Sequence, residues 1–313
     1  MCLSTLYQSK NGLLETKAEY NNSKTMKSDY FIGLPQWKHP EWNRSLLQDP
    51  DQGDLEQYAA SFNSVEGNTT FYGLPGEASV RRWMDGTPAG FRFCFKFPQS
   101  ISHQGALRHV DAELGAFLDR LQPLAPKLGM LCLQLPSRFG PDHLPDLIRF
   151  LGELPAGLRY AVEVRHLAFF QRGDAEKRFN DALQAFGVNR VNFDTRALFA
   201  NPQSDPITRE ALEQKPRLPL RVLATGDAPM LRFISPLDLQ QGQRWLQPWI
   251  NQMLQWIGEG KTPFIFMHTP SNGEAPELAR WFAQQLQQRQ PKLAAGFHDW
   301  NARKLVRRQP GLF

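Results

Sequence analysis

Cysteine is scarce in this chain, which has only Cys2, Cys94 and Cys132 among its 313 residues. Three cysteines cannot form the disulfide framework on which small secreted proteins rely. Long apolar runs are also missing, because no stretch approaches about 18 uninterrupted apolar residues, so we expect no membrane span. Residues 1–25 lack the apolar block of a signal peptide. These absences predict a cytoplasmic protein without a membrane partner.

A charge excess of one sign is missing from most of the chain. The sequence has 36 basic and 31 acidic residues, which gives a net charge of +5. Four of the basic residues lie close together near the C-terminus: Arg303, Lys304, Arg307 and Arg308. Without these four residues the net charge is +1, so we expect no global basic field for nucleic acid. A local basic patch remains an alternative.

Short runs rich in aromatic and aliphatic residues recur roughly every 30 to 40 residues, the usual length of one βα unit. The eight runs are 30–34, 62–66, 91–97, 130–135, 160–164, 188–193, 230–234 and 264–268. Helical patterns lie between them, as in the apolar residues of 114–121, which have the spacing of one helix face. This alternation predicts a single TIM-like (β/α)8 barrel over residues 26–296. The alternative is a doubly wound open sheet, which is weakened because no Gly-x-Gly-x-x-Gly follows an early strand.

Three segments fall outside the alternation of strand and helix. Residues 1–25 are polar and aperiodic, and we expect a disordered extension upstream of the natural start, with a short helix at Leu13–Tyr20 as the alternative. Residues 201–228 form a longer, proline-bearing insertion between the sixth and seventh strands. Residues 297–313 form a basic tail.

The tail ends with Gln309, Leu312 and Phe313 in a pattern that looks like the Gln-x-x-Leu-Phe peptide with which bacterial repair and replication proteins dock on the sliding clamp. An exposed Leu-Phe pair at the end of a tail has a role when it fills an apolar pocket. The alternatives are that Leu312 and Phe313 pack on their own barrel or have no role. The pattern predicts the sliding clamp as a partner and, through it, a link to DNA.

Polar side chains lie at or near the C-terminal end of every predicted strand, where barrel enzymes place their active sites. Strand side chains alternate between two faces, so Glu66 shares a face with Asn68, and Glu163 with Arg165. The expected catalytic residues are Glu66, Lys96, Glu163, Asp194 and His268. The expected substrate-binding residues are Trp37, Asn68, Tyr72, His103, Gln134, Arg165 and Arg232. The alternative is a salt-bridge network that closes the barrel mouth, and for His103 a loop-capping histidine.

The charges of these candidates balance, because three carboxylates accompany three cations. Arg165 and Arg232 could hold a phosphate or carboxylate through paired hydrogen bonds. Glu66 or Glu163 could act as a general base, and His268 could shuttle protons near neutral pH. This combination of carboxylates, cations and a histidine predicts a small anionic or phosphate-bearing ligand.

The same strand ends offer two further hypotheses, a divalent metal site and a lysine Schiff base. Glu66, Glu163, Asp194 and His268 could together hold a divalent metal, although the nearby cations argue against it and the sequence has no His-x-His or His-Glu-x-x-His. Lys96 could lose its proton by desolvation and form a Schiff base with a carbonyl substrate. For Lys96 we favour the alternative, an ion pair with Glu66 or Glu163.

Six motifs within residues 30–290 together resemble the domain of unknown function family 72, the YecE-like proteins. They are IGLPQW (32–37), FNSVEGNTTFYGLP (62–75), FRFCFKFPQSISH (91–103), LQLP (133–136), YAVEVRH (160–166) and VNRVNFDTR (188–196). The resemblance implies a TIM-barrel-like fold and no established activity. Many relatives have an Asn-Asn motif where this chain has FMHTPSNGEAP (266–276), and an Arg-Leu-His-Gly type where it has RFIS, so a role of that strand-seven histidine would be missing here.

The leading hypothesis from the sequence is a barrel enzyme that acts on a phosphate-bearing substrate, with nucleic acid as one candidate, by phosphodiester or related hydrolysis. A non-catalytic protein that binds an anionic ligand and is recruited through its tail is the first alternative. A sugar-isomerase-like or aldolase-like enzyme of small molecules is the second.

Overall fold

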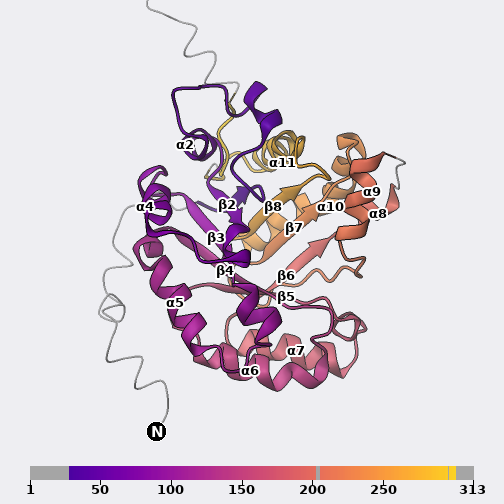
Figure 1. Ribbon diagram of the computed structural model, residues 1–313. Coiled ribbons are helices and arrows are strands. Elements are labelled where there is room, and N and C mark those ends of the chain that lie inside the picture. The colour runs from indigo at the N-terminus through magenta and orange to yellow at the C-terminus, as the bar shows by residue number, and fades with distance from the viewer. Residues whose placement is uncertain (1–27, 202–204, 295, 301–313) are drawn as a thin grey trace, which may run out of the picture.

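The computed structural model describes residues 28–201, 205–294 and 296–300, which form an eight-stranded parallel barrel surrounded by helices (Figure 1). The sheet order is β1-β8-β7-β6-β5-β4-β3-β2. The strands are β1 Phe31–Gly33, β2 Ser64–Gly67, β3 Arg92–Lys96, β4 Leu128–Gln134, β5 Tyr160–Glu163, β6 Asn189–Asp194, β7 Met230–Ile234 and β8 Phe264–His268. All eight predicted strands are present, and the predicted single (β/α)8 barrel is confirmed.

The barrel is nearly closed by the approach of β1 to β2. The backbone N–H of Glu66 donates to the carbonyl of Leu34 at 2.9 Å. A Cβ atom on Gly33 would lie 2.0 Å from the carbonyl oxygen of Ser64. A side chain at Gly33 would therefore push the two strands apart, and glycine is required by this close approach.

Helices follow the strands and cover the outside of the sheet. The longer ones are α4 Glu77–Asp85, α5 Asp111–Leu121, α6 Leu144–Glu153, α7 Asp174–Ala185, α9 Pro206–Gln214, α10 Leu239–Gly258 and α11 Ala275–Arg289. The short ones are η2 Pro40–Arg44, α2 Asp54–Ala59, α3 Thr69–Tyr72, η3 Ser100–Gln104, η4 Gln122–Lys127, η5 Pro141–His143, η6 Leu167–Phe170 and α8 Arg196–Ala200. The apolar face predicted for 114–121 is buried on α5. Within the described residues, no helix is long and apolar enough to cross a membrane.

Alternation along the strands divides the core into two layers. On β4, Met130 and Cys132 belong to an inner cluster with Cys94. Leu131 and Leu133 belong to the outer cluster, which packs under the helices. Each fully buried side chain of this size contributes about 1.5–3 kcal/mol relative to its exposed state. The two layers hold each strand in one register, so the polar strand ends are held in fixed positions.

The described end of the chain lies against the barrel. Phe297 forms an antiparallel bridge with Phe62, just before β2, and Trp300 is 3% exposed beside the same ring. Residues 297–300, the beginning of the expected tail, therefore pack on the body of the protein. Gln309, Leu312 and Phe313, like the expected extension at residues 1–25, lie outside the described residues.

Candidate functional site

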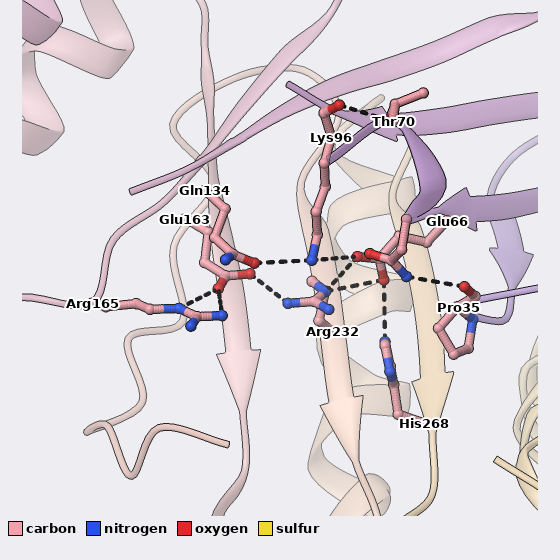
Figure 2. A network of polar contacts seen from close by, with 10 residues as sticks. Pro35, Glu66, Thr70, Lys96, Gln134, Glu163, Arg165, Arg232 and His268 are labelled. Carbon is pink, nitrogen blue, oxygen red and sulfur yellow. Dashed lines mark hydrogen bonds and ion pairs between the residues drawn. The ribbon is translucent and has the colours of Figure 1, made fainter. Parts of the chain in front are cut away.

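Arg232 of β7 lies at the centre of the polar strand ends. Its Nε is 2.9 Å from Oε1 of Glu66 on β2 and 3.0 Å from Oε2 of the same carboxylate. Its Nη1 donates to Oε2 of Glu163 on β5, so the guanidinium lies between the two carboxylates (Figure 2). All three side chains are exposed by 5% or less. The three strands are not neighbours in the sheet, so these contacts cross the barrel interior.

Lys96 of β3 reaches the same carboxylate of Glu66. Its Nζ donates to Oε1 of Gln134 at 2.9 Å and lies 3.8 Å from Oε1 of Glu66. The partner closest to this ammonium is therefore a neutral amide rather than a carboxylate. Oε1 of Glu66 is buried and accepts no hydrogen bond from a described residue, although Arg232 is in ion contact with it. Both ion contacts of that oxygen among the described residues are with cations, Arg232 and Lys96.

Arg165 and His268 each contact one of the two carboxylates. The Nε and Nη2 atoms of Arg165 donate to Oε1 of Glu163 at 3.0 and 2.9 Å. The Arg165 side chain is 25% exposed, so it extends from the buried carboxylate toward the surface. Nε2 of His268, on β8, lies 3.2 Å from Oε2 of Glu66. Six strands, β2, β3, β4, β5, β7 and β8, thus supply one connected charge cluster. We define it as Glu66, Lys96, Gln134, Glu163, Arg165, Arg232 and His268.

The cations keep both carboxylates ionised. Burial alone would raise the pKa of Glu66, but Arg232, the His268 hydrogen bond and Lys96 hold it well below its usual range. Burial opposes ionisation of Glu163 as well, and Arg232, Arg165 and Lys96 lower its pKa to about 2. Burial and the neighbouring Arg232 lower the pKa of Lys96, against the attraction of Glu66 and Glu163. The lysine is therefore the cation of the cluster that gives up its proton most readily.

His268 is neutral near pH 7. Burial lowers its pKa to about 4, in spite of the hydrogen bond and the charge of Glu66. Because an ionised carboxylate can only accept, Nε2 of His268 carries the hydrogen that Glu66 receives. The other ring nitrogen, Nδ1, then carries the lone pair of the neutral imidazole.

Asp194 does not join the charge cluster, contrary to the expectation from the sequence. The preceding residue, Phe193, faces the interior, where its ring centroid lies 5.1 Å from the guanidinium carbon of Arg232. Asp194 faces the helices, where Oδ2 accepts from Nε1 of Trp249 at 2.8 Å and Oδ1 accepts from Nε of Arg196 at 2.9 Å. The position at the strand end was correct, but the alternation along β6 puts this carboxylate on the other face.

Four predicted binding residues are not members of the charge cluster. Asn68 donates to the carbonyl of Pro35 at 3.0 Å, and its Oδ1 is buried without a donor among the described residues. His103 is at the rim, with its ring centroid 5.1 Å from that of Phe71. Tyr72, which is 77% exposed, lines a separate surface groove. Trp37 packs edge-on against Trp83 of α4, at a centroid distance of 5.6 Å, and so belongs to the helix layer.

Lys215 is a cation that was not among the site residues expected from the sequence. It follows α9 in the insertion, and burial, Arg232 and Lys96 lower its pKa, while Glu66 and Glu163 raise it. The charge of Lys215 is therefore coupled to the charges of the cluster, although Lys215 is not on a strand. No described carboxylate lies within 4.0 Å of its ammonium. The available signal was the length of the proline-bearing insertion, since long loops in compact barrels are often functional.

The cluster does not have the composition of a divalent metal site. In the described part of the chain, no three His, Cys, Asp or Glu residues are grouped so that they could hold a metal ion. Asp194 lies on the other face of β6, and the guanidinium of Arg232 lies between Glu66 and Glu163. A divalent cation there would replace or repel Arg232, so the four residues proposed as ligands do not fit such a metal.

The chain is similar to proteins whose function is unknown. The family model described as "Protein of unknown function DUF72" matches residues 31–302. The UPF0759 protein YecE of Escherichia coli strain K12 is 45% identical over 266 residues, which cover 85% of this chain and 95% of that protein. The YecE protein of Escherichia coli O157:H7 matches with the same identity and coverage.

Two solved structures share the barrel. A DUF72 family protein from Enterococcus faecalis V583 superposes with a TM-score of 0.62 at 19% identity, over 82% of this chain and 95% of that one. A DUF72 family protein from Thermotoga maritima MSB8 superposes with a TM-score of 0.58 at 19% identity, over 82% of this chain and 99% of that one. At these identities the likeness shows the fold alone.

Proposed function

The chain belongs to the DUF72 family of proteins of unknown function, and we propose that its charge cluster is the active site of an enzyme that acts on a small, phosphate-bearing substrate. The observation that carries this proposal is the excess of positive charge at the strand ends. Two ionised carboxylates, Glu66 and Glu163, face Lys96, Arg165 and Arg232, and Lys215 adds a further cation. Uncompensated charge in a buried site is costly, so an anion there is favoured.

Some cations of the site are held in buried ion pairs, whereas others can contact a ligand. Arg232 is held by Glu66 and Glu163, so it positions the two carboxylates rather than gripping the substrate. Lys215 has no carboxylate within ion-pair distance among the described residues. Arg165 donates through Nε and Nη2 to Glu163, but its side chain is 25% exposed and can be reached by a ligand. We assign the phosphate to Arg165 and Lys215, because a guanidinium and an ammonium both bind phosphate oxygens.

We assign proton transfer to Glu66 and His268. Oε1 of Glu66 is buried without a hydrogen-bond donor among the described residues and could accept one from a substrate hydroxyl or a water. The neutral His268 is oriented by its hydrogen bond to Glu66 and presents Nδ1 as a proton acceptor. A bound phosphate would raise the low pKa of His268, because a nearby anion favours the imidazolium. Substrate binding would thus move His268 toward the range in which general bases work.

The test is a titration with inorganic phosphate and ribose 5-phosphate, followed by calorimetry, at low ionic strength. We expect both to bind, with about tenfold weaker binding in Arg165→Gln and in Lys215→Met. Turnover is then measured with phosphomonoesters and with bis(4-nitrophenyl) phosphate, and we expect His268→Gln to retain binding and lose turnover. Absence of anion binding contradicts the proposal, and binding without turnover of any ester favours the non-catalytic ligand-binding protein instead.

A second candidate function follows from the surroundings of Lys96. Its ammonium is 2.9 Å from the neutral amide of Gln134 but 3.8 Å from Glu66, and burial beside Arg232 lowers its pKa. Such a lysine can attack a substrate carbonyl carbon, forming a C–N bond while the carbonyl oxygen leaves as water. Borohydride reduction in the presence of dihydroxyacetone phosphate would then add the reduced adduct to Lys96, as peptide mass spectrometry would show. Lys96→Arg should show no adduct, and an unmodified Lys96 in the native protein would exclude this aldolase-like chemistry.

Docking on a sliding clamp and a role with DNA remain a separate proposal, supported by the sequence pattern of Gln309, Leu312 and Phe313 alone. Fluorescence polarisation of a labelled peptide of residues 305–313 with a bacterial sliding clamp is the direct test. We expect binding that Leu312→Ala with Phe313→Ala abolishes. Equal polarisation for the two peptides would remove the argument for DNA metabolism.

A further inference from the structure

A surface groove of about 410 Å³ lies beside the charge cluster. It is formed by α3, the turn of η3 and α5, and its apolar lining is Phe71, Tyr72, Leu74, Pro98, Ala112 and Ala116. Such a volume is in the range of small-ligand sites. The mechanism proposed above makes no use of this groove.

Tyr72 is the feature of the groove that most needs an explanation. Its side chain is 77% exposed, and its neighbour Leu74 is 45% exposed. Within the described residues, the ring contact of Tyr72 is with Phe71, edge-on at a centroid distance of 5.3 Å. Exposed aromatic rings that line a concave surface are typical of sites where a planar group stacks.

Phe71 connects the groove to the charge cluster. Nζ of Lys96 lies 5.8 Å from the centroid of the Phe71 ring, and the ring of His103 lies 5.1 Å from it. Arg138 donates to the backbone carbonyl of His103. Burial lowers the pKa of His103, and Arg165, Arg138 and Lys96 lower it further, against the attraction of Glu163. The end of the groove at Phe71 therefore lies beside the ammonium of Lys96.

The polar groups that line the groove itself are amides and a carboxylate rather than cations. Gln99 and Gln104 bring amides that can both donate and accept, and Glu113 brings a carboxylate. A phosphate inside the groove would be repelled by Glu113, whereas ring N–H groups would be attracted to it. A ligand with a planar ring and an anionic end would thus lie with its ring in the groove and its anion toward His103.

We propose that the groove binds the base of a nucleotide, stacked on Tyr72, while the phosphate of that nucleotide enters the charge cluster past His103. This inference rests on the proposed function and narrows its substrate class from phosphate compounds in general to nucleoside phosphates. A sugar phosphate without a base would leave the apolar groove unused. The nucleotide could be free or part of a single strand, because both present the same base and phosphate.

The experiment compares ligands that share a phosphate but differ in the base. Calorimetric titrations use AMP, GMP, CMP, UMP and ribose 5-phosphate on the full chain, and a single-stranded octanucleotide in a separate arm. We expect at least one nucleoside monophosphate to bind about tenfold more tightly than ribose 5-phosphate. Tyr72→Ala should remove this difference and leave the binding of ribose 5-phosphate unchanged, whereas Tyr72→Phe should retain it. Phe186→Ala, which alters a 42% exposed aromatic at the end of α7, is the matched control and should bind like the unaltered protein.

Each outcome has a definite meaning. Tighter binding of the octanucleotide than of any mononucleotide, lost in Tyr72→Ala, supports the proposal and identifies a strand as the source. Equal binding of ribose 5-phosphate and all four mononucleotides, or no effect of Tyr72→Ala, overturns the nucleotide assignment and leaves the proposed phosphate site standing. No binding of any phosphate compound, ribose 5-phosphate included, overturns both.

Discussion

Nε of Arg232 lies 2.9 Å from Oε1 of Glu66, although 166 residues separate the two in the chain. The same guanidinium also contacts Glu163, so one cation compensates two buried carboxylates. This relationship makes Arg232 the structural centre of the candidate site. It also explains why Glu66 can stay ionised at the end of an apolar strand.

Replacing Arg232 with methionine should strongly destabilise the protein, because Glu66 and Glu163 would both be left buried without their main partner. Breaking a buried ion pair by removing one member costs about 3–5 kcal/mol. Urea denaturation at pH 7 measures this loss in the free energy of unfolding. Adding Glu66→Gln and Glu163→Gln to Arg232→Met should recover part of it, and a loss below about 1 kcal/mol in the single variant would show that the pairs are not coupled as described.

Stability should fall as the pH drops from 6.5 to 4, because of His268. Its pKa is about 4 in the folded protein against 6.5 for an ordinary histidine, so the unfolded chain takes up a proton in this range that the folded protein does not. Each pKa unit corresponds to about 1.4 kcal/mol, so the loss amounts to about 3 kcal/mol. Glu163, with a pKa of about 2, adds a further loss from pH 4.5 toward 2.

His268→Gln removes the histidine titration and keeps a side chain that can donate to Glu66. Urea denaturation of this variant at pH 6.5, 5.5 and 4.5 should give a flatter dependence than the unaltered protein. Parallel curves for the two proteins would mean that His268 is not the group that titrates.

Asp194→Asn should lower stability without affecting the candidate site. Asp194 is fully buried and accepts from Trp249 and Arg196, whereas an asparagine keeps one acceptor and loses the charge that pairs with Arg196. A lost charged hydrogen bond costs about 1–3 kcal/mol. Thermal denaturation should show the loss, while the affinity for inorganic phosphate stays within about twofold. A tenfold loss of phosphate affinity in the folded variant would show that Asp194 contributes to the candidate site after all.

Lys215→Met should weaken phosphate binding about tenfold with little effect on stability. The lysine ammonium has no carboxylate within ion-pair distance among the described residues, so its removal leaves no buried partner behind. Lys261→Met is the control, because Lys261 lies at the other end of the barrel, before β8, and pairs with Glu259. Raising the salt concentration should reduce the difference between the unaltered protein and Lys215→Met, since screening weakens the contribution of a partly exposed cation. Equal phosphate affinity in both variants would remove Lys215 from the site.

The sequence by itself determined the barrel and the polar character of its strand ends. Periodicity along the chain is a local property, so the apolar runs and the helical patterns between them predicted all eight strands. The alternation within each strand paired Glu66 with Asn68 and Glu163 with Arg165. In the structure both carboxylates are in contact with Arg232.

The tertiary structure decided which charges meet. Asp194 ends its strand like Glu66 but points to Trp249, because the register of β6 puts Phe193 inside. Lys215 comes from an insertion whose path no periodicity describes, and its position near Arg232 depends on how that insertion packs over the barrel. Coulomb interactions depend on distance in space rather than along the chain, so the net charge and the protonation of the candidate site follow from the fold and not from the residue count.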